Sequence, residues 1–110
     1  MTTISRSKDV VTLINLFCVE PRNQQALVDV LIEATESVMK HLPGFISANI
    51  HRSLDSTRVV NYAQWRSKED FEAIFTNPQV LPHFKKALDL CTTQNDGRLY
   101  EVVHVDEVNA

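Results

Sequence analysis

The sequence predicts an α+β fold of the ferredoxin-like type, in which helices cover one face of a four-stranded antiparallel sheet. The hydrophobic patterns along the 110 residues follow the order strand, helix, strand, strand, helix, strand, which is the ferredoxin-like order. Glycine and proline are scarce, with 2 and 4 residues, so most of the chain is expected in regular elements. The length fits one domain over residues 1–110, with residues 1–8 as a flexible N-terminus.

The first strand and the first helix are predicted from two different periodicities. Val10–Val19 is rich in β-branched and aromatic residues, which is typical of a strand. After it, Asn23 is available to cap a helix of about five turns, because apolar residues recur at three- and four-residue steps. The members of this stripe are Leu27, Val30, Leu31, Ala34 and Val38. Pro43 and Gly44 end the helix.

The middle of the chain predicts a β-hairpin. Its strands are Phe45–Ser53 and Arg58–Arg66. Between them, the polar residues 55–57 supply a turn, so the two strands are expected to pair antiparallel.

Two helical stretches and a last strand complete the pattern. Ser67 is a suitable N-cap for the first stretch. Asn77 and Pro78 break it and begin the second, with asparagine as cap and proline at the first position. The two apolar stripes are Phe71, Ile74 and Phe75, then Leu81, Phe84, Ala87 and Leu88. A turn at 95–97 leads to the last strand, Leu99–Val105.

Composition and charge narrow the class of protein. The formal charge is −3, from 14 acidic and 11 basic residues, which predicts no binding to nucleic acid. Apolar runs of about ten residues are too short to span a membrane, and no signal peptide is visible, so a cytoplasmic location is expected. Cys18 and Cys91 match no metal spacing and are expected as reduced thiols.

Both faces of the predicted sheet carry apolar side chains, as the alternation along the first strand illustrates. One face holds Leu13, Asn15 and Phe17, and the other holds Thr12, Ile14, Leu16 and Cys18. Leaving apolar surface in water costs about 25 cal/mol per Å². A second copy of the chain is therefore expected to cover the free face in a symmetric homodimer.

Polar residues on these apolar strands mark a candidate site. Asn61 and Trp65 share a face of the third strand, as Asn15 does with its apolar neighbours on the first. On the second strand, alternation groups Phe45, Ser47, Asn49 and His51. If these sets face the helices, Asn15, His51, Asn61 and Trp65 meet in one cavity. The expected rim is Phe17, Phe71, Phe75 and Phe84.

These residue types suit proton abstraction and enolate stabilisation rather than hydrolysis. Asparagine binds both carbonyl and hydroxyl groups, the indole of Trp65 donates one N–H, and a histidine takes up a proton near neutral pH. Structural interpretations stand beside these: Asn61 as a strand amide, Trp65 as core, and His51 and His83 as surface residues. No dinucleotide, phosphate-binding or metal motif is present, so neither a cofactor nor a metal is expected.

The segments VVNYAQWRSKEDF and PGFISANIHRS resemble the antibiotic biosynthesis monooxygenase family, and in particular its cofactor-independent anthrone oxygenases. The resemblance extends from LINLFCV through NPQVLPHF to the last strand. It implies a dimeric α/β barrel with a pocket between sheet and helices in each subunit. It also implies that a reduced aromatic substrate activates O₂ without a cofactor.

The resemblance also implies roles for individual residues. Asn61 and Trp65 match the polar pair that holds the enolate and the peroxide, Asn15 matches a second asparagine of one branch, and His51 matches a pocket histidine of another. Phe71 stands where one branch has tyrosine, and Lys85 where that branch has arginine. With the aromatic rim included, the expected substrate-binding residues are Phe17, Phe71, Phe75, His83, Phe84 and Lys85. Haem-degrading relatives have a helical tryptophan where this chain has Ile74, although His83 keeps that alternative open.

The sequence therefore predicts a cofactor-independent monooxygenase that converts an anthrone or hydroquinone-like aromatic into a quinone with O₂. Two alternatives share the scaffold. One is a non-redox isomerase of a small carbonyl compound, which would turn over without oxygen. The other is a ligand-binding stress protein, which would bind tightly and yield no product.

Overall fold

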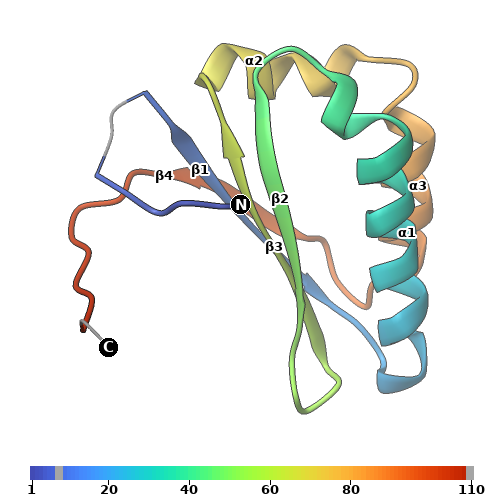
Figure 1. The fold of residues 1–110 in the computed structure, drawn as a ribbon. Coiled ribbons are helices and arrows are strands. Elements are labelled where there is room, and N and C mark those ends of the chain that lie inside the picture. The colour runs from blue at the N-terminus through green and yellow to red at the C-terminus, as the bar shows by residue number, and fades with distance from the viewer. Residues whose placement is uncertain (7–8, 109–110) are drawn as a thin grey trace.

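The four strands form one antiparallel sheet in the order β2-β3-β1-β4, which is the predicted ferredoxin-like arrangement (Figure 1). The computed structural model describes residues 1–6 and 9–108. The strands are β1 (Val11–Cys18), β2 (Phe45–Arg52), β3 (Arg58–Trp65) and β4 (Asp96–Tyr100). The helices are α1 (Gln24–Ser37), α2 (Lys68–Glu72) and α3 (Leu81–Asp89), with 3-10 turns η1 (Pro21–Asn23), η2 (Met39–His41) and η3 (Ala73–Thr76).

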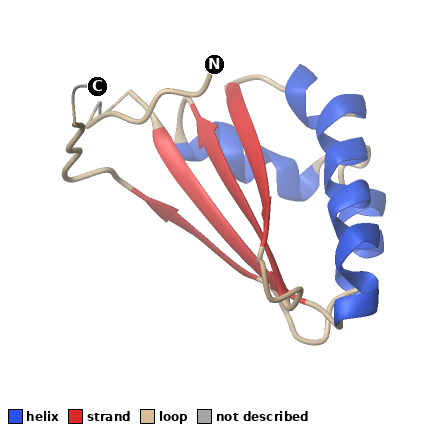
Figure 2. Ribbon diagram, turned by 60° about the horizontal axis from the view of Figure 1, so that its bottom comes forward, coloured by secondary structure: helices blue, strands red, loops and turns tan. Residues whose placement is uncertain are grey.

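All the helices of the described chain lie on one face of the sheet (Figure 2). The core between helices and sheet has two parts. One surrounds Trp65, near α2 and η3, and contains Leu13, Ala63, Ile74 and Val80. The other surrounds Leu27, under α1 and α3, and contains Phe17, Val19, Val59 and Ala87. The helices are therefore anchored at both ends of the strands.

Leu27 offers a direct test of this packing, because its side chain is 0% exposed. We expect Leu27→Ala to lower the free energy of unfolding by about 2–5 kcal/mol, through lost burial and the cavity left behind. Urea denaturation followed by circular dichroism measures it. Ile32→Ala on the same helix is the control, because Ile32 is 46% exposed. Equal losses in the two variants would contradict the packing described.

A β-bulge in β2 changes which face its side chains occupy. Phe45 pairs with Trp65, but the register shifts before Ser47, which pairs with Gln64. From there on, Ala48 and Ile50 lie opposite residues of the helix-facing set of β3. The predicted grouping of Phe45 with Ser47, Asn49 and His51 is therefore wrong, because one extra residue reverses the alternation. After the bulge, the polar members of β2 lie on the face away from the helices.

The start of α2 follows the prediction. The Ser67 hydroxyl accepts a hydrogen bond from the Asp70 backbone N–H at 3.1 Å and donates one to the Asp70 carboxylate at 2.8 Å. The neighbouring guanidinium of Arg66 and the Ser67 hydroxyl lower the pKa of the Asp70 carboxyl. A Cβ at Gly44 would lie 2.4 Å from this carboxylate, and φ is +81° there, so glycine is needed at the turn before β2.

α1 begins directly after Asn23, as predicted, although the Asn23 side chain makes no capping bond. Two other boundaries differ from the predictions. The Asn77 side chain accepts from the Gln79 N–H at 2.8 Å in a turn, so α3 begins only at Leu81. The last strand is Asp96–Tyr100 instead of Leu99–Val105, because its partner β1 begins at Val11 and offers little to pair with beyond Tyr100.

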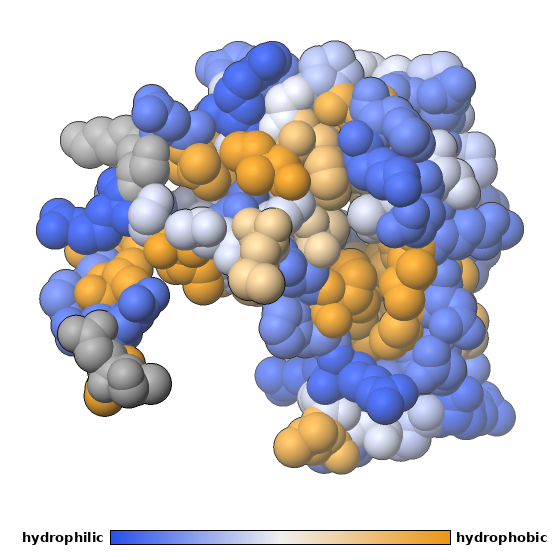
Figure 3. Space-filling model, in the orientation of Figure 1, coloured by the Kyte–Doolittle hydropathy of each residue, from blue (hydrophilic) through white to orange (hydrophobic). Residues whose placement is uncertain are grey.

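The sheet face away from the helices carries apolar side chains together with a few polar ones. Its central members include Ile14, Leu16, Val60 and Tyr62. Part of it is covered by the N-terminus, where Thr2 donates to Asn49 at 2.8 Å and Gln64 donates to the Thr3 carbonyl at 2.7 Å. Figure 3 shows apolar surface over the strands as well as beside α1. The predicted homodimer, which would cover this face, stays a prediction.

The N-terminal stretch expected to be flexible is described in part. Residues 1–6 and 9 are among the described ones, and residues 7–8 lie outside them. The flexibility itself stays a prediction. Among the described residues, no helix is long and apolar enough to cross a membrane.

Candidate active site

A cavity of about 360 Å³ lies between the helix-facing side of the sheet and the segment from α2 to β4. Its apolar wall is built from β1, α2, η3 and α3, and its polar wall comes from β1 and the loop before β4. The lining residues are Leu13, Asn15, Phe17, Phe71, Phe75, Phe84, Ala87, Leu88, Gln94, Asn95 and Gly97. None of these described lining residues carries an ionisable side chain, so the cavity is neutral.

A row of aromatic rings runs from the core into this cavity. The Trp65 ring meets Phe71 edge-on at 6.1 Å between centroids, and Phe71 meets Phe75 edge-on at 5.3 Å. Phe75 stacks on Phe84 at 6.0 Å with an angle of 24° between the planes. Because Phe75 is 53% exposed, it lies at the opening of the cavity. Such a wall favours a flat aromatic ligand, which stacks on its rings.

The polar side of the cavity centres on Asn15. In the sheet, Asn15 lies between Asn61 of β3 and Gly97 of β4, so all three positions are on the helix-facing side. The Asn95 amide nitrogen donates a hydrogen bond to the Asn15 side-chain oxygen at 2.9 Å. A Cβ at Gly97 would lie 3.0 Å from that same oxygen, so the glycine leaves room for the amide.

Two buried polar atoms on this side of the sheet have no hydrogen-bond partner within the described chain. They are the Asn61 side-chain oxygen and the Trp65 indole nitrogen. Trp65 is only 1% exposed. A buried polar atom without a partner costs free energy of about 1–3 kcal/mol, so such atoms in a folded protein call for an explanation. A bound ligand that forms hydrogen bonds with these two atoms would explain why they have no partner in the protein.

The structure supports some of the predicted placements. Asn15, Asn61 and Trp65 lie on the same face, as the alternation of β1 and β3 predicts. The four predicted rim residues, Phe17, Phe71, Phe75 and Phe84, all line the cavity. Asn61 and Trp65 themselves are not lining residues, and Trp65 is linked to the cavity through its contact with Phe71. Their roles in catalysis stay predictions.

Other placements are wrong. The bulge in β2 puts His51 on the opposite face, where it is exposed and bonded through Nδ1 to the Asn49 carbonyl at 2.9 Å. Lys85 points into solvent and binds Asp89 at 2.9 Å, one helical turn along α3. His83, like Asn61 and Trp65, is absent from the cavity lining, and its predicted role stays a prediction. His83 and Lys85 are the sequence neighbours of Phe84 on α3. Because an α-helix turns by about 100° per residue, they point in other directions than Phe84, which faces the cavity.

Sequence reasoning missed Gln94, Asn95 and Gly97. The sequence predicts a turn for Asn95 and Gly97, because Asn-Asp-Gly is a typical turn sequence, and it makes no prediction for Gln94. In the structure Asp96 and Gly97 belong to β4, and Gly97 pairs with Asn15. A signal was present in the glycine itself, since a glycine inside a strand often marks a close approach of other groups.

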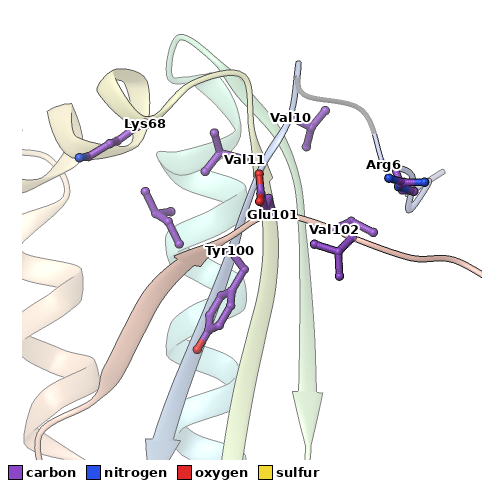
Figure 4. Close-up of a pocket in the computed structure, with 9 residues that line it drawn as sticks. Arg6, Val10, Val11, Lys68, Tyr100, Glu101 and Val102 are labelled. Atoms are coloured by element: carbon purple, nitrogen blue, oxygen red, sulfur yellow. The ribbon is translucent and has the colours of Figure 1, made fainter.

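A larger cavity of about 600 Å³ lies at the edge of the sheet, beside the start of β1 and the end of β4 (Figure 4). Its lining includes Arg6, Lys68 and Glu101 with several valines. It contains no aromatic row. We therefore place the candidate site in the inner, aromatic cavity.

The described part of the chain contains no cluster of side chains that could bind a metal ion. No group of three or more histidine, cysteine, aspartate or glutamate side chains lies together there. Cys18 and Cys91 are free, and burial raises the pKa of the Cys91 thiol, which keeps it protonated. That the protein needs no cofactor stays a prediction.

The fold and the cavity define a ferredoxin-like α+β domain with a neutral, largely aromatic cavity between its sheet and helices and a few neutral hydrogen-bonding groups in the cavity wall. The chain belongs to the antibiotic biosynthesis monooxygenase family, whose sequence pattern matches residues 10–90. It is 51% identical over 84 residues to the tetracenomycin-F1 monooxygenase of Streptomyces glaucescens, which covers 76% of this chain and 75% of that protein. The predictions of family and of a monooxygenase are thereby confirmed.

Solved structures confirm the fold. A monooxygenase from the gene ActVA-Orf6 of Streptomyces coelicolor, in complex with nanaomycin D, superposes with a TM-score of 0.78 at 24% identity, covering 92% of this chain and 93% of that one. SnoaB, a cofactor-independent oxygenase from Streptomyces nogalater, superposes with a TM-score of 0.73 at 24% identity, covering 88% and 96%.

Proposed function

We propose that this monooxygenase converts an anthrone-like polycyclic aromatic into a quinone with O₂ and without a bound cofactor. The observation that carries the proposal is the neutral aromatic cavity with Asn15 in its wall and two unpartnered polar atoms, on Asn61 and Trp65, beside it. The 51% identical relative is named for its action on tetracenomycin F1, and that name favours a fused-ring aromatic substrate here.

The proposed reaction balances without a further reactant. The substrate CH₂ between two aromatic rings loses a proton, and the resulting enolate passes one electron to O₂. The substrate radical and superoxide combine into a peroxide anion, which takes a proton back from solvent to become a hydroperoxide. The remaining C–H bond of that carbon and the O–O bond then break as water leaves, and the carbon becomes a carbonyl. One substrate and one O₂ thus give one quinone and one water.

In this proposal, the protein binds and orients rather than taking the proton. The phenylalanine rings hold the substrate plane, and N–H donors stabilise the negative charge on the enolate oxygen. Because no described lining residue is ionisable, the proton leaves to solvent at the open side of the cavity, beside Phe75.

Oxygen uptake with dithranol, a simple anthrone, tests the proposal. The purified protein, without added flavin or metal, is expected to consume one O₂ per anthrone and to yield the corresponding quinone faster than buffer does. Turnover of a carbonyl substrate in the absence of oxygen would instead support the isomerase. Tight quinone binding with no acceleration of oxygen uptake would support a binding protein. Either result would overturn the proposal.

A further inference from the structure

The hydrogen bond between Asn95 and Asn15 decides which end of the Asn15 amide is free. The Asn95 nitrogen donates to the Asn15 oxygen at 2.9 Å, so the oxygen is occupied. Within the described chain the Asn15 side-chain nitrogen donates no hydrogen bond, and Asn15 lines the cavity. An amide held in this way offers N–H donors to whatever fills the cavity.

The surroundings of the pair favour this single orientation. Gly97 faces Asn15 across β1 and β4 and leaves its oxygen just enough space, since a Cβ there would approach it to 3.0 Å. Asn95 reaches the cavity from the loop before β4, a position far in sequence from Asn15. The contact therefore joins two walls of the cavity by one hydrogen bond.

We propose that Asn95 is a positioning residue, which holds the Asn15 carboxamide so that its N–H groups point at an anionic or carbonyl oxygen of the ligand. The catalytic consequence rests on the proposed function, because the enolate oxygen would be the group that Asn15 stabilises. The binding consequence does not, because a quinone carbonyl accepts the same hydrogen bond. Neither residue is ionisable, so the effect is one of orientation.

Two substitutions of Asn95 test whether it acts by orienting the Asn15 amide or only by filling space. Asn95→Ala removes the donor and leaves the Asn15 amide free to turn. Asn95→Asp replaces the donor by a carboxylate, which only accepts, and so draws the Asn15 nitrogen away from the cavity. When that carboxylate is protonated, its O–H donates again and restores the original orientation. The unperturbed pKa of aspartate is about 4, and burial raises it.

The titratable and charged groups near the pair are few. Asp96, the next residue and the first of β4, is bonded to Arg98 of the same strand at 2.8 Å. On α3, Asp89 is bonded to Lys85 at 2.9 Å. A change of ligand binding with pH in the Asn95→Asp variant that is missing from the wild type therefore reports on the introduced carboxyl group.

The readout is quenching of Trp65 fluorescence by the dihydroxyanthraquinone product, which needs no turnover. Trp65 is the single tryptophan of the chain, so the signal comes from one place beside the cavity. At about pH 8 we expect Asn95→Ala to weaken quinone binding about fivefold and Asn95→Asp about thirtyfold, in line with the loss of one hydrogen bond and then its reversal. The Asn95→Asp defect is expected to shrink as the pH falls toward about 4.

Thr93→Asp is the matched control. It adds the same charge to the same loop at an exposed residue outside the cavity lining, and is expected to bind the quinone like the wild type. Gly97→Ala is a second test, made on β4. Its Cβ would lie 3.0 Å from the Asn15 side-chain oxygen and displace the amide, so we expect an intact fold with weaker quinone binding.

The outcomes distinguish the two proposals. Wild-type affinity in both Asn95 variants, or an Asn95→Asp defect that does not change with pH, would overturn the positioning role. If these binding results appear as expected while wild-type protein fails to oxidise dithranol, the positioning role stands and the proposed oxidation falls. If dithranol is oxidised equally by the wild type and the variants, the proposed oxidation stands and the positioning role falls.

Discussion

Asn61→Leu is expected to abolish most of the oxygenase activity while leaving the protein as stable as before, or more stable. The Asn61 side-chain oxygen is buried with no partner in the described chain. In the free protein this atom costs free energy, and leucine, which has the same number and branching of side-chain heavy atoms as asparagine, removes that cost. An amide oxygen only accepts, so in the complex it would bind a hydroxyl group of the substrate and not the enolate oxygen. We expect kcat/KM to fall about tenfold, through the loss of that one hydrogen bond.

Measuring both the stability and the activity of Asn61→Leu distinguishes a ligand-binding role of Asn61 from a structural one. A structural strand amide loses stability when it is replaced, whereas a ligand-binding one does not. We expect the free energy of unfolding of Asn61→Leu to rise by about 1 kcal/mol. Urea denaturation measures this, and oxygen uptake with dithranol measures the activity. A large loss of stability with proportional loss of activity would contradict the assignment.

Asn49 supplies a matched control on the other face of the sheet. Its amide nitrogen donates to the Tyr62 carbonyl at 2.9 Å, and its oxygen accepts from Thr2 at 2.8 Å. Both ends are therefore partnered, and the residue lies away from the aromatic cavity. Asn49→Ala is expected to lower the free energy of unfolding by about 1–2 kcal/mol and to leave the activity per folded molecule unchanged.

How far the sequence could predict the site depended on the regularity of each strand. β1 and β3 pair without interruption, so alternation placed Asn15, Asn61 and Trp65 on one face correctly. β2 contains a bulge, and nothing in its composition marks one at Ile46, so the alternation failed for His51. A period-two pattern gives the face of a side chain only as far as the next irregularity.

The aromatic wall was predictable for a different reason. Phe71 and Phe75 are four residues apart and lie on one side of a helical stretch, so their meeting follows from local geometry. The loop residues Asn95 and Gly97 were not predictable, because their place in the cavity depends on pairing with β1, about eighty residues away along the chain. Local patterns found the apolar half of the cavity, and tertiary pairing supplied much of the polar half.

The pH dependence of the reaction is expected to belong to the substrate and not to the protein. No described residue that lines the cavity is ionisable, and His51, the predicted base, lies on the other face of the sheet. We therefore expect kcat/KM with dithranol to rise about tenfold per pH unit up to the pKa of the anthrone itself, with no plateau near the histidine value of about 6.5. Over three pH units this amounts to a change of about a thousandfold, which oxygen uptake in matched buffers resolves after subtraction of the uncatalysed rate. His51→Ala and His83→Ala are expected to leave the profile unchanged, since neither side chain lines the cavity. An inflection near neutral pH that disappears in His83→Ala would show that this histidine takes the proton, and that the neutral cavity closes differently around its substrate.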